Sequence, residues 1–175
     1  MFTVGHSTRD LPVFLELLKS HGVKQLADVR TIPRSRKNPQ FNFDTLPARL
    51  RAAGIRYVPL RELGGLRHAK RDSTNTGWRN ASFRGFADYM QRPEFETGLA
   101  RLIKIAEERP TAIMCAEAVP WRCHRSLIAD ALTARGVRVR HIIGPREPRQ
   151  HTLTPFARVD GERVTYPAPL LVEDK

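Results

Sequence analysis

Hydrophobic and polar positions follow two alternating patterns along this chain. Short apolar stretches rich in β-branched residues predict strands, and apolar residues that recur on one face at helical spacing predict amphipathic helices. Glycines at 22, 54 and 136 mark the ends of three of these helices. The expected strands are 2–4, 25–29, 55–60, 112–114 and 137–143. The expected helices are 11–20, 45–53, 83–90, 94–107 and 122–135.

The alternation of strands and helices predicts an α/β fold. We expect a mostly parallel sheet of about five strands with helices on both faces, because each crossover helix must pack against the sheet. Residues 158–166 predict a short C-terminal β hairpin that turns at Asp160-Gly161. The chain divides into an α/β domain over 1–145 and a proline-rich extension over 146–175 that packs on it. Residues 61–82 have neither period, which is typical of a lid or a disordered loop.

In a parallel sheet of this kind, ligands bind beyond the carboxyl ends of the strands. The chemically unusual residues of this sequence follow four of the expected strands, and we therefore predict that they converge on one edge of the sheet. They are Gly5-His6-Ser7, then Asp28 and Arg30, then Glu62-Leu63-Gly64-Gly65, then Cys115 and Glu117.

The stretch AIMCAEAVPWRCHR, residues 112–125, carries the most reactive chemistry. A helix N-terminus and Arg122 would lower the pKa of the Cys115 thiol and favour a nucleophilic thiolate. Glu117 or His124 would then serve as the acid or base. Alternatively, Cys115 is a small buried apolar residue. Cys123 lies on the expected core face of the following helix and is interpreted as structural.

A basic composition suggests an anionic partner. Lys and Arg number 30 against 18 Asp and Glu, the formal net charge is +12, and 24 of the cations are Arg, whose planar fork grips phosphate or carboxylate. A GC-rich genome would explain the arginine bias equally well, although it explains the net charge less well. The candidate anion-binding residues are His6, Ser7, Asp28, Arg30, Arg34, Arg122 and Arg125.

Each member of this anion-binding set has a simpler alternative. Exposed arginines are often solvated, or they pair with carboxylates such as Asp28 and Glu62. His6 is equally well interpreted as a core histidine whose hydrogen bonds are satisfied. Asp28 is as well suited to orienting Arg30 as to acting in catalysis.

Several classes of protein are excluded or disfavoured. No apolar run reaches about 18 residues, so we expect no membrane span, and the first residues lack the features of a signal peptide. Two cysteines without an export signal favour reduced thiols in the cytoplasm. A cysteine phosphatase loop, Cys-x5-Arg, would need arginine where Trp121 stands. The spacing of Cys115, Cys123 and His124 does not suit zinc, and the absence of glycine-rich nucleotide motifs predicts no cofactor, neither NAD nor a standard ATP site.

The combined motifs resemble those of a known family, domain of unknown function 488 (DUF488), over residues 2–145. They are Gly5-His6-Ser7, Asp28-Val29-Arg30 with Pro33 and Ser35, Leu63-Gly64-Gly65, Cys115-Ala116-Glu117 and Cys123-His124-Arg125. The resemblance implies a bacterial or archaeal protein with an α/β fold. It also implies that the Cys-Ala-Glu and Cys-His-Arg positions matter, but it supplies no reaction.

Three functions remain open from the sequence. The first is an enzyme that acts on a phosphate-bearing substrate, a nucleotide or nucleic acid, through Cys115, Glu117 and His124. The second is a non-catalytic nucleic-acid-binding module that uses stacking aromatics among basic loops. The third is a redox sensor in which Cys115 and Cys123 form a disulfide. The residues of the second are Phe41, Phe43, Trp78 and Phe83 among Arg34, Arg36, Lys37, Arg67, Lys70, Arg71 and Arg79.

Overall fold

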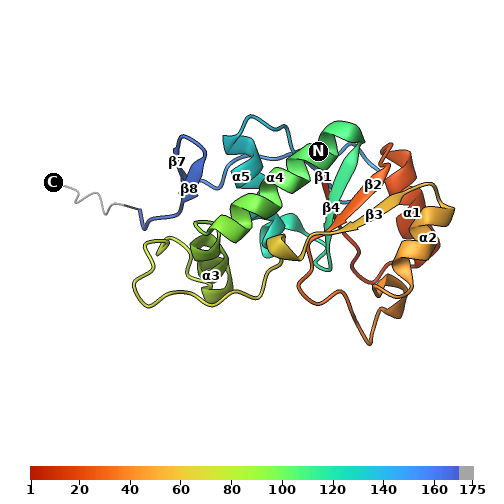
Figure 1. The fold of residues 1–175 in the computed structure, drawn as a ribbon, viewed down its shortest axis with the longest axis horizontal. Helices are drawn as coiled ribbons and strands as arrows, with labels where there is room; N and C mark the ends of the chain where they lie inside the picture. Colours follow the sequence, from red (N-terminus) through yellow and green to blue (C-terminus); the bar gives the residue numbers. More distant parts are fainter. Residues whose placement is uncertain (170–175) are drawn as a thin grey trace.

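A central six-stranded sheet organises the structure, a computed structural model that describes residues 1–169 (Figure 1). Its strand order is β3-β2-β4-β1-β5-β6, and every pair is parallel except the last, β5 with β6. The strands are β1 (Phe2–Gly5), β2 (Gln25–Asp28), β3 (Arg56–Pro59), β4 (Thr111–Cys115), β5 (Arg140–Ile142) and β6 (Arg149–Gln150). The predicted mostly parallel α/β fold is confirmed; the sequence analysis missed only the two-residue edge strand β6.

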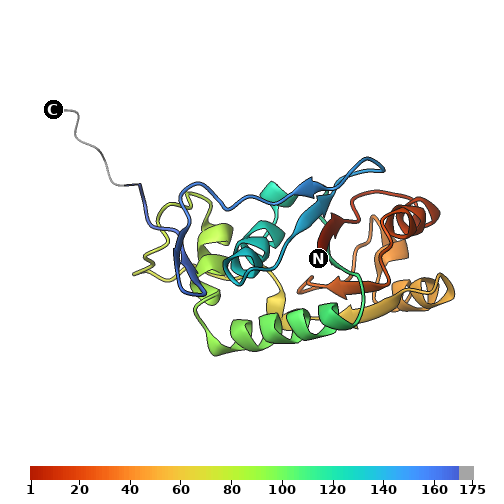
Figure 2. The same ribbon diagram turned by 90° about the horizontal axis from the view of Figure 1, so that it is seen from above.

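Helices cover both faces of the sheet, as the sequence predicted. One face packs against α1 and α2, and the other packs against α3, α4 and α5. Figure 2 shows the separation, with α4 along the lower side and α1 and α2 at the right. Successive residues of β4 alternate between the two cores, because side chains along a strand point to opposite faces. The helices are α1 (Leu11–Ser20), α2 (Leu46–Ala52), α3 (Ala81–Tyr89), α4 (Pro93–Glu108) and α5 (Arg125–Ala134).

Local sequence explains where the helices begin and end. Pro12 stands in the first turn of α1, where a missing N–H costs nothing, and Leu11, Phe14 and Leu18 form its buried stripe. The chain leaves α1 through Gly22, whose φ of +69° a side-chain-bearing residue adopts only with strain. Helix α5 begins at Arg125 rather than at 122, because Pro120–Arg122 form a separate short 3-10 helix, η3, and Cys123 is extended.

The long segment 64–80 is irregular, as expected, but it is folded against α3. Asp88 lies on that helix and is buried. Its carboxylate accepts hydrogen bonds from the backbone N–H of Lys70, the hydroxyl of Ser73 and the amide of Asn75, at 2.6 to 2.8 Å. Gly85 lets this segment cross the helix closely, because a Cβ there would collide with the carbonyl group of Arg67. The loop is therefore a packed part of the domain.

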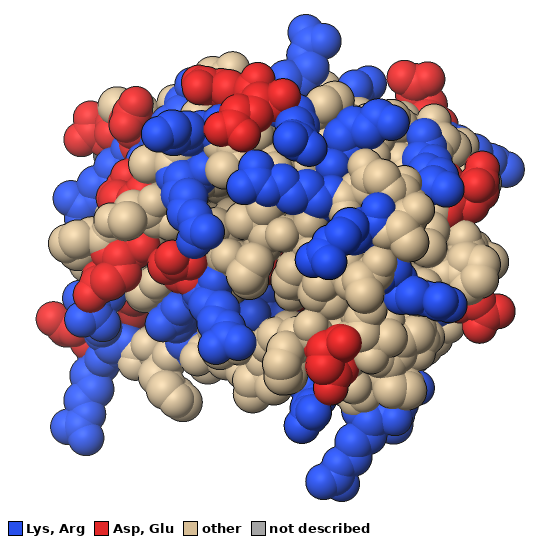
Figure 3. Space-filling view, turned by 45° about the vertical axis from the view of Figure 1, so that its right-hand side comes forward, with Lys and Arg blue, Asp and Glu red and all other residues tan. Residues whose placement is uncertain are grey.

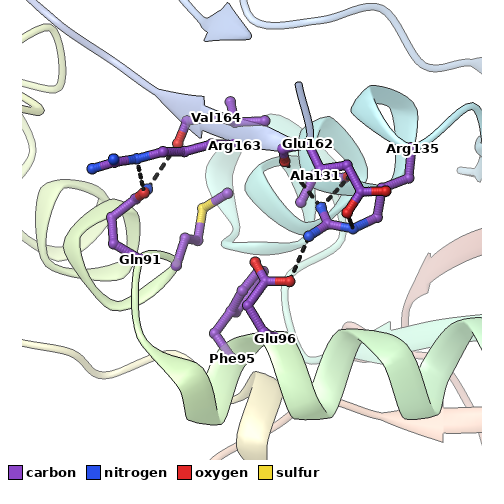
Figure 4. A pocket seen from close by; sticks show the side chains of 9 residues that line it. Gln91, Phe95, Glu96, Ala131, Arg135, Glu162, Arg163 and Val164 are labelled. Carbon is purple, nitrogen blue, oxygen red and sulfur yellow. Dashed lines mark hydrogen bonds and ion pairs between the residues drawn. The ribbon is translucent and has the colours of Figure 1, made fainter. Parts of the chain in front are cut away.

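The predicted C-terminal hairpin is confirmed as β7 (Arg158–Asp160) and β8 (Arg163–Thr165). It docks beside α3 and α5, at the opposite end of the molecule from α1 and α2 (Figure 1). Figure 4 shows its seat: the Arg135 guanidinium contacts the carboxylates of Glu96 and Glu162 at 2.6 and 3.5 Å, and Gln91 donates to the Val164 carbonyl at 2.8 Å. The cavity of about 360 Å³ beside these ion pairs contains no cysteine or histidine, so it is not the candidate site.

Residues 146–169 thus contact the α/β core directly, although the division into a domain and an extension stays a prediction, and 170–175 lie outside the described residues. Within the described part of the chain, no helix has the length and apolar character needed to cross a membrane.

Candidate functional site

All four predicted segments contribute residues to one edge of the sheet, although Glu62 is not among them and pairs with Arg101 instead. Strand β1 ends at Gly5, beside the end of β4 at Cys115, and the backbone N–H of His6 donates to the Cys115 carbonyl at 3.0 Å. Gly5 is required there, because a Cβ would collide with the backbone of Glu117. Ser7 follows with a φ of 52°, an unfavourable left-handed conformation for serine, and its N–H donates to the Ala116 carbonyl.

Two cavities lie side by side at this edge. The larger, of about 430 Å³, is lined by Cys115, Cys123, His124 and Arg122, with Phe83 and Phe86 among its apolar residues. The smaller, of about 290 Å³, is lined mainly by hydroxyl, amide and cationic groups. We call them the thiol cavity and the polar cavity. The residues that line both are Arg30, Ile32, Ala116 and Glu117. The lining residues of the polar cavity alone are His6, Ser7, Thr8, Arg34, Ser35, Asn38 and Ala118.

Cys123 and His124 form a thiol–imidazole pair in the thiol cavity. The His124 Nε2 atom lies 3.0 Å from the Val29 carbonyl oxygen, and its Nδ1 atom lies 3.5 Å from the Cys123 sulfur. A carbonyl can only accept, so Nε2 carries the proton and Nδ1 is free to accept the proton of the thiol. His124 also packs against Phe86, with 5.0 Å between the ring centroids. The imidazole is therefore held in the orientation that a general base for Cys123 needs.

The two thiols have opposite pKa shifts. The neighbouring Cys115 thiol, together with His124 and Arg125, lowers the pKa of Cys123 well below that of an ordinary thiol. Burial, above all, raises the pKa of Cys115, whose sulfur contacts the Glu117 carbonyl oxygen at 3.9 Å. These directions differ from the expectation that Cys115 would carry the lowered pKa. The helix whose N-terminus we expected to stabilise the Cys115 thiolate is α5, which begins only at Arg125.

Arg125 is fully buried and has no carboxylate partner among residues 1–169. Its guanidinium donates to the Glu117 carbonyl and, at 3.5 Å, to the Thr3 hydroxyl, and its Nε has no acceptor among the described groups. A buried cation without a counter-ion is costly. The positive charge of Arg125 acts to lower the pKa values of both cysteine thiols. A thiolate at either cysteine would therefore offset part of the cost of burying Arg125.

A buried hydrogen-bond chain continues from Thr3 to Asp130, and sequence reasoning missed it. Thr3 Oγ1 lies 2.7 Å from His141 Nδ1, His141 Nε2 lies 2.8 Å from His151 Nδ1, and His151 Nε2 lies 2.8 Å from Asp130 Oδ1. Because the carboxylate only accepts, His151 carries a proton on Nε2. These residues are far apart in sequence and stand in no motif, so only their buried polar character could have drawn attention to them.

The predicted anion-binding residues divide between free and occupied groups. Asp28 binds Arg30 through two hydrogen bonds, at 2.7 and 2.9 Å, and also accepts from the Tyr57 hydroxyl. Arg30 Nη1 donates to His6 Nε2 at 3.3 Å, and His6 is buried against Phe41. Asp28 therefore orients Arg30, and His6 is a neutral histidine whose hydrogen bonds are satisfied; burial lowers its pKa to about 4.

The exposed members of the set remain available to a ligand. Arg122 is exposed at the thiol cavity, and Arg34 is exposed at the polar cavity, where it pairs with Asp44 at 3.3 Å. Glu117 is exposed on the shared wall and its carboxylate accepts from the N–H of Ala118. Ser7 lines the polar cavity.

The basic loops do not present the aromatic surface that the sequence suggested. Phe41 is buried, and Trp78 packs against Phe83 and Phe156 with 4.9 Å between ring centroids in each pair. Of the four aromatics, Phe43 alone is exposed, at 46%, with the Arg34 guanidinium over its ring. On the face that Figure 3 shows, basic side chains are spread widely and acidic ones lie among them, so no single basic patch dominates that face.

Fold and site together define an α/β protein with paired cysteines and a histidine at the carboxyl edge of a parallel sheet. The chain belongs to the family described as Domain of unknown function DUF488, whose model matches residues 10–132. That range includes both cysteines, Glu117, His124 and Arg125, but not Gly5-His6-Ser7 or the hairpin. Comparisons with curated proteins and with solved structures gave no significant match.

Proposed function

We propose that this protein is an enzyme that attacks a phosphate-bearing substrate, a nucleotide or nucleic acid, with the thiolate of Cys123. The observation that supports this most directly is the Cys123–His124 pair in the thiol cavity, with 3.5 Å between Sγ and Nδ1 and the far ring nitrogen held by the Val29 carbonyl. A thiol beside an oriented imidazole is the arrangement of nucleophilic cysteine catalysis. Buried Arg125 further favours the thiolate.

The remaining residues have distinct roles in this proposal. His124 removes the thiol proton, and Cys115 donates a hydrogen bond to the thiolate rather than attacking. Glu117 borders both cavities, where it would serve as an acid or base. The sequence motifs favoured Cys115 as the nucleophile; the contact of Cys123 with His124 and the pKa directions favour Cys123 instead.

The anionic part of the substrate would bind at the polar cavity and its rim. Ser7, Ser35 and Asn38 line this cavity beside Arg34, and hydroxyls, amides and guanidinium groups are the usual ligands of phosphate oxygens. Arg122 would contact the same substrate from the thiol cavity. Since the two cavities share the wall at Glu117, a single substrate could present its phosphate to one and its electrophilic atom to the other.

A covalent trap tests the proposal. The reduced protein is incubated with mononucleotides and short oligonucleotides, quenched in acid and analysed by peptide mass spectrometry. We expect a covalent adduct on Cys123, loss of turnover in Cys123→Ser, and a decrease of about 10²-fold or more in His124→Gln. Arg34→Gln should raise KM, whereas Arg71→Gln, an exposed arginine outside both cavities, is the matched control. Full turnover in Cys123→Ser would refute the proposal.

A further inference from the structure

Cys115 and Cys123 bring two free thiols to the same cavity. Cys115 ends β4, and Cys123 follows η3 after seven intervening residues that fold back over the sheet edge. Cys115 and Cys123 are 3% and 7% exposed, and both line the thiol cavity. A disulfide between them requires the two sulfur atoms to approach to about 2.05 Å, with their Cβ atoms about 3.5–4.5 Å apart.

The surroundings of the two sulfur atoms favour a thiolate at Cys123 and a protonated thiol at Cys115. Cys123 contacts His124 and lies near Arg125, which favour its thiolate. The Cys115 sulfur contacts the carbonyl oxygen of Glu117, and burial raises the pKa of this thiol, so that it keeps its proton. A thiolate that attacks first and a protonated thiol that attacks second are the two partners of a dithiol–disulfide cycle.

We propose that Cys115 and Cys123 form a two-electron redox centre that is oxidised by a small hydroperoxide. The Cys123 thiolate attacks the terminal peroxide oxygen, the O–O bond breaks, and Cys123 becomes a sulfenic acid while the leaving oxygen takes up a proton. The Cys115 sulfur then attacks the Cys123 sulfur, the S–O bond breaks, and the departing hydroxide leaves as water with the Cys115 proton. With hydrogen peroxide the sum is two thiols and one peroxide to one disulfide and two waters.

A small hydroperoxide fits this site better than a protein disulfide does. Both sulfurs are almost fully buried, and the cavity that reaches them has about 430 Å³ with the phenyl rings of Phe83 and Phe86 in its lining. A disulfide on another protein would have to enter this cavity together with the polypeptide that carries it, whereas a molecule as small as hydrogen peroxide can enter it alone.

This inference rests on the proposed function for one point, the thiolate at Cys123. It adds a consequence for the same site, because the disulfide would occupy the nucleophile and its hydrogen-bond donor together. Oxidation would then stop the proposed reaction, and reduction by a small dithiol would restore it.

The test is intact-mass analysis of reduced protein after one equivalent of hydrogen peroxide, with alkylation of remaining thiols. Wild-type protein should lose two hydrogens and both alkylation sites. Cys115→Ser should instead gain one oxygen, which dimedone traps at Cys123, and Cys123→Ser should react at least about 100-fold more slowly. Circular dichroism of both variants shows whether they fold.

Two results would overturn the inference: a wild-type sulfenic acid that never proceeds to the disulfide, or oxidation of Cys123→Ser as fast as wild type. Failure of the two proposals can be told apart. A disulfide without any nucleotide adduct would leave the redox centre standing and remove the proposed enzyme. An adduct without a disulfide would do the reverse.

Discussion

Gly65 lies against the ring of His124, and the absence of a side chain at this position leaves room for the imidazole. A Cβ on Gly65 would lie 3.1 Å from Nδ1 and 3.4 Å from two ring carbons of His124. The nitrogen that it would approach is the one that faces the Cys123 sulfur at 3.5 Å. The paired glycines at 64 and 65 are therefore part of the site although they carry no chemistry, since Gly64 is similarly crowded by Thr31.

We predict that Gly65→Ala raises the pKa of the Cys123 thiol. The added methyl group would displace the imidazole by a few tenths of an ångström and lengthen its contact with the thiol. Alkylation of Cys123 by iodoacetamide, followed against pH, should show a higher apparent pKa than in wild type. Gly144→Ala is the control, because its Cβ would meet nothing within 4 Å. An unchanged alkylation profile in Gly65→Ala would mean that His124 does not tune the thiol.

At the scale of elements, Asp130 joins α5 to the C-terminal segment. Its buried carboxylate accepts from His151 Nε2, from the backbone N–H and hydroxyl of Thr154, and from the Tyr166 hydroxyl, at 2.7 to 3.1 Å. All three partners lie beyond residue 132, where the family match ends. Through His141 and Thr3 the same hydrogen-bond chain reaches Arg125, so the segment that follows the family match contacts the support of the thiol cavity.

We predict that Asp130→Ala lowers the free energy of unfolding by about 3 kcal/mol or more, because His151, Thr154 and Tyr166 lose their acceptor while His151 and Tyr166 remain buried. Urea denaturation would measure the loss. Limited proteolysis should cut 144–169 faster in this variant than in wild type. Asp160→Ala, which removes an exposed carboxylate on β7, is the comparison; it should change the free energy of unfolding by no more than about 0.5 kcal/mol and leave the cleavage rate as in wild type. Equal stability of both variants would make the Asp130 network dispensable.

At the scale of the whole molecule, the charge excess coexists with buried histidines that must stay neutral. Burial is the largest cause that lowers the pKa values of His6 and His141 to about 4. His6 Nε2 accepts from Arg30, so protonation of His6 would break this contact. Protonation of either histidine would also add a positive charge near a buried guanidinium, Arg30 beside His6 and Arg125 beside His141.

We predict that stability decreases as the pH falls from about 6.5 to about 4. In this pH window the unfolded chain binds protons at His6 and His141 and the native state does not, so proton binding stabilises the unfolded state relative to the native state. Each histidine should cost about 2 kcal/mol at pH 5, with the full effect reached below pH 4. Urea unfolding at pH 7.5 and 5.0 measures it. His141→Gln should remove about half of the difference, whereas His68→Gln, an exposed histidine, should leave it unchanged; a flat profile in wild type would contradict the assignment.

The sequence alone determined the order of elements and the edge on which the site stands. Apolar periodicity located α1 at 11–20, glycine ended it, and the β-α alternation required a parallel sheet, because only a helix-length crossover can return a strand in the same direction. The same logic placed residues after β1, β2 and β4 together. These conclusions depend on local pattern and chain connectivity, both of which can be read along one dimension.

Only the tertiary structure decided which groups at that edge are free to act. Asp28 occupies Arg30, burial keeps Cys115 protonated, and Cys123, expected to be structural, contacts His124 and acquires the lowered pKa. The chain of hydrogen bonds that links Arg125 to Asp130 through Thr3, His141 and His151 joins residues from four distant segments. Such facts depend on burial and on contacts between residues far apart in sequence, because solvation and neighbouring charges set the pKa of a side chain, and no spacing along the chain records them.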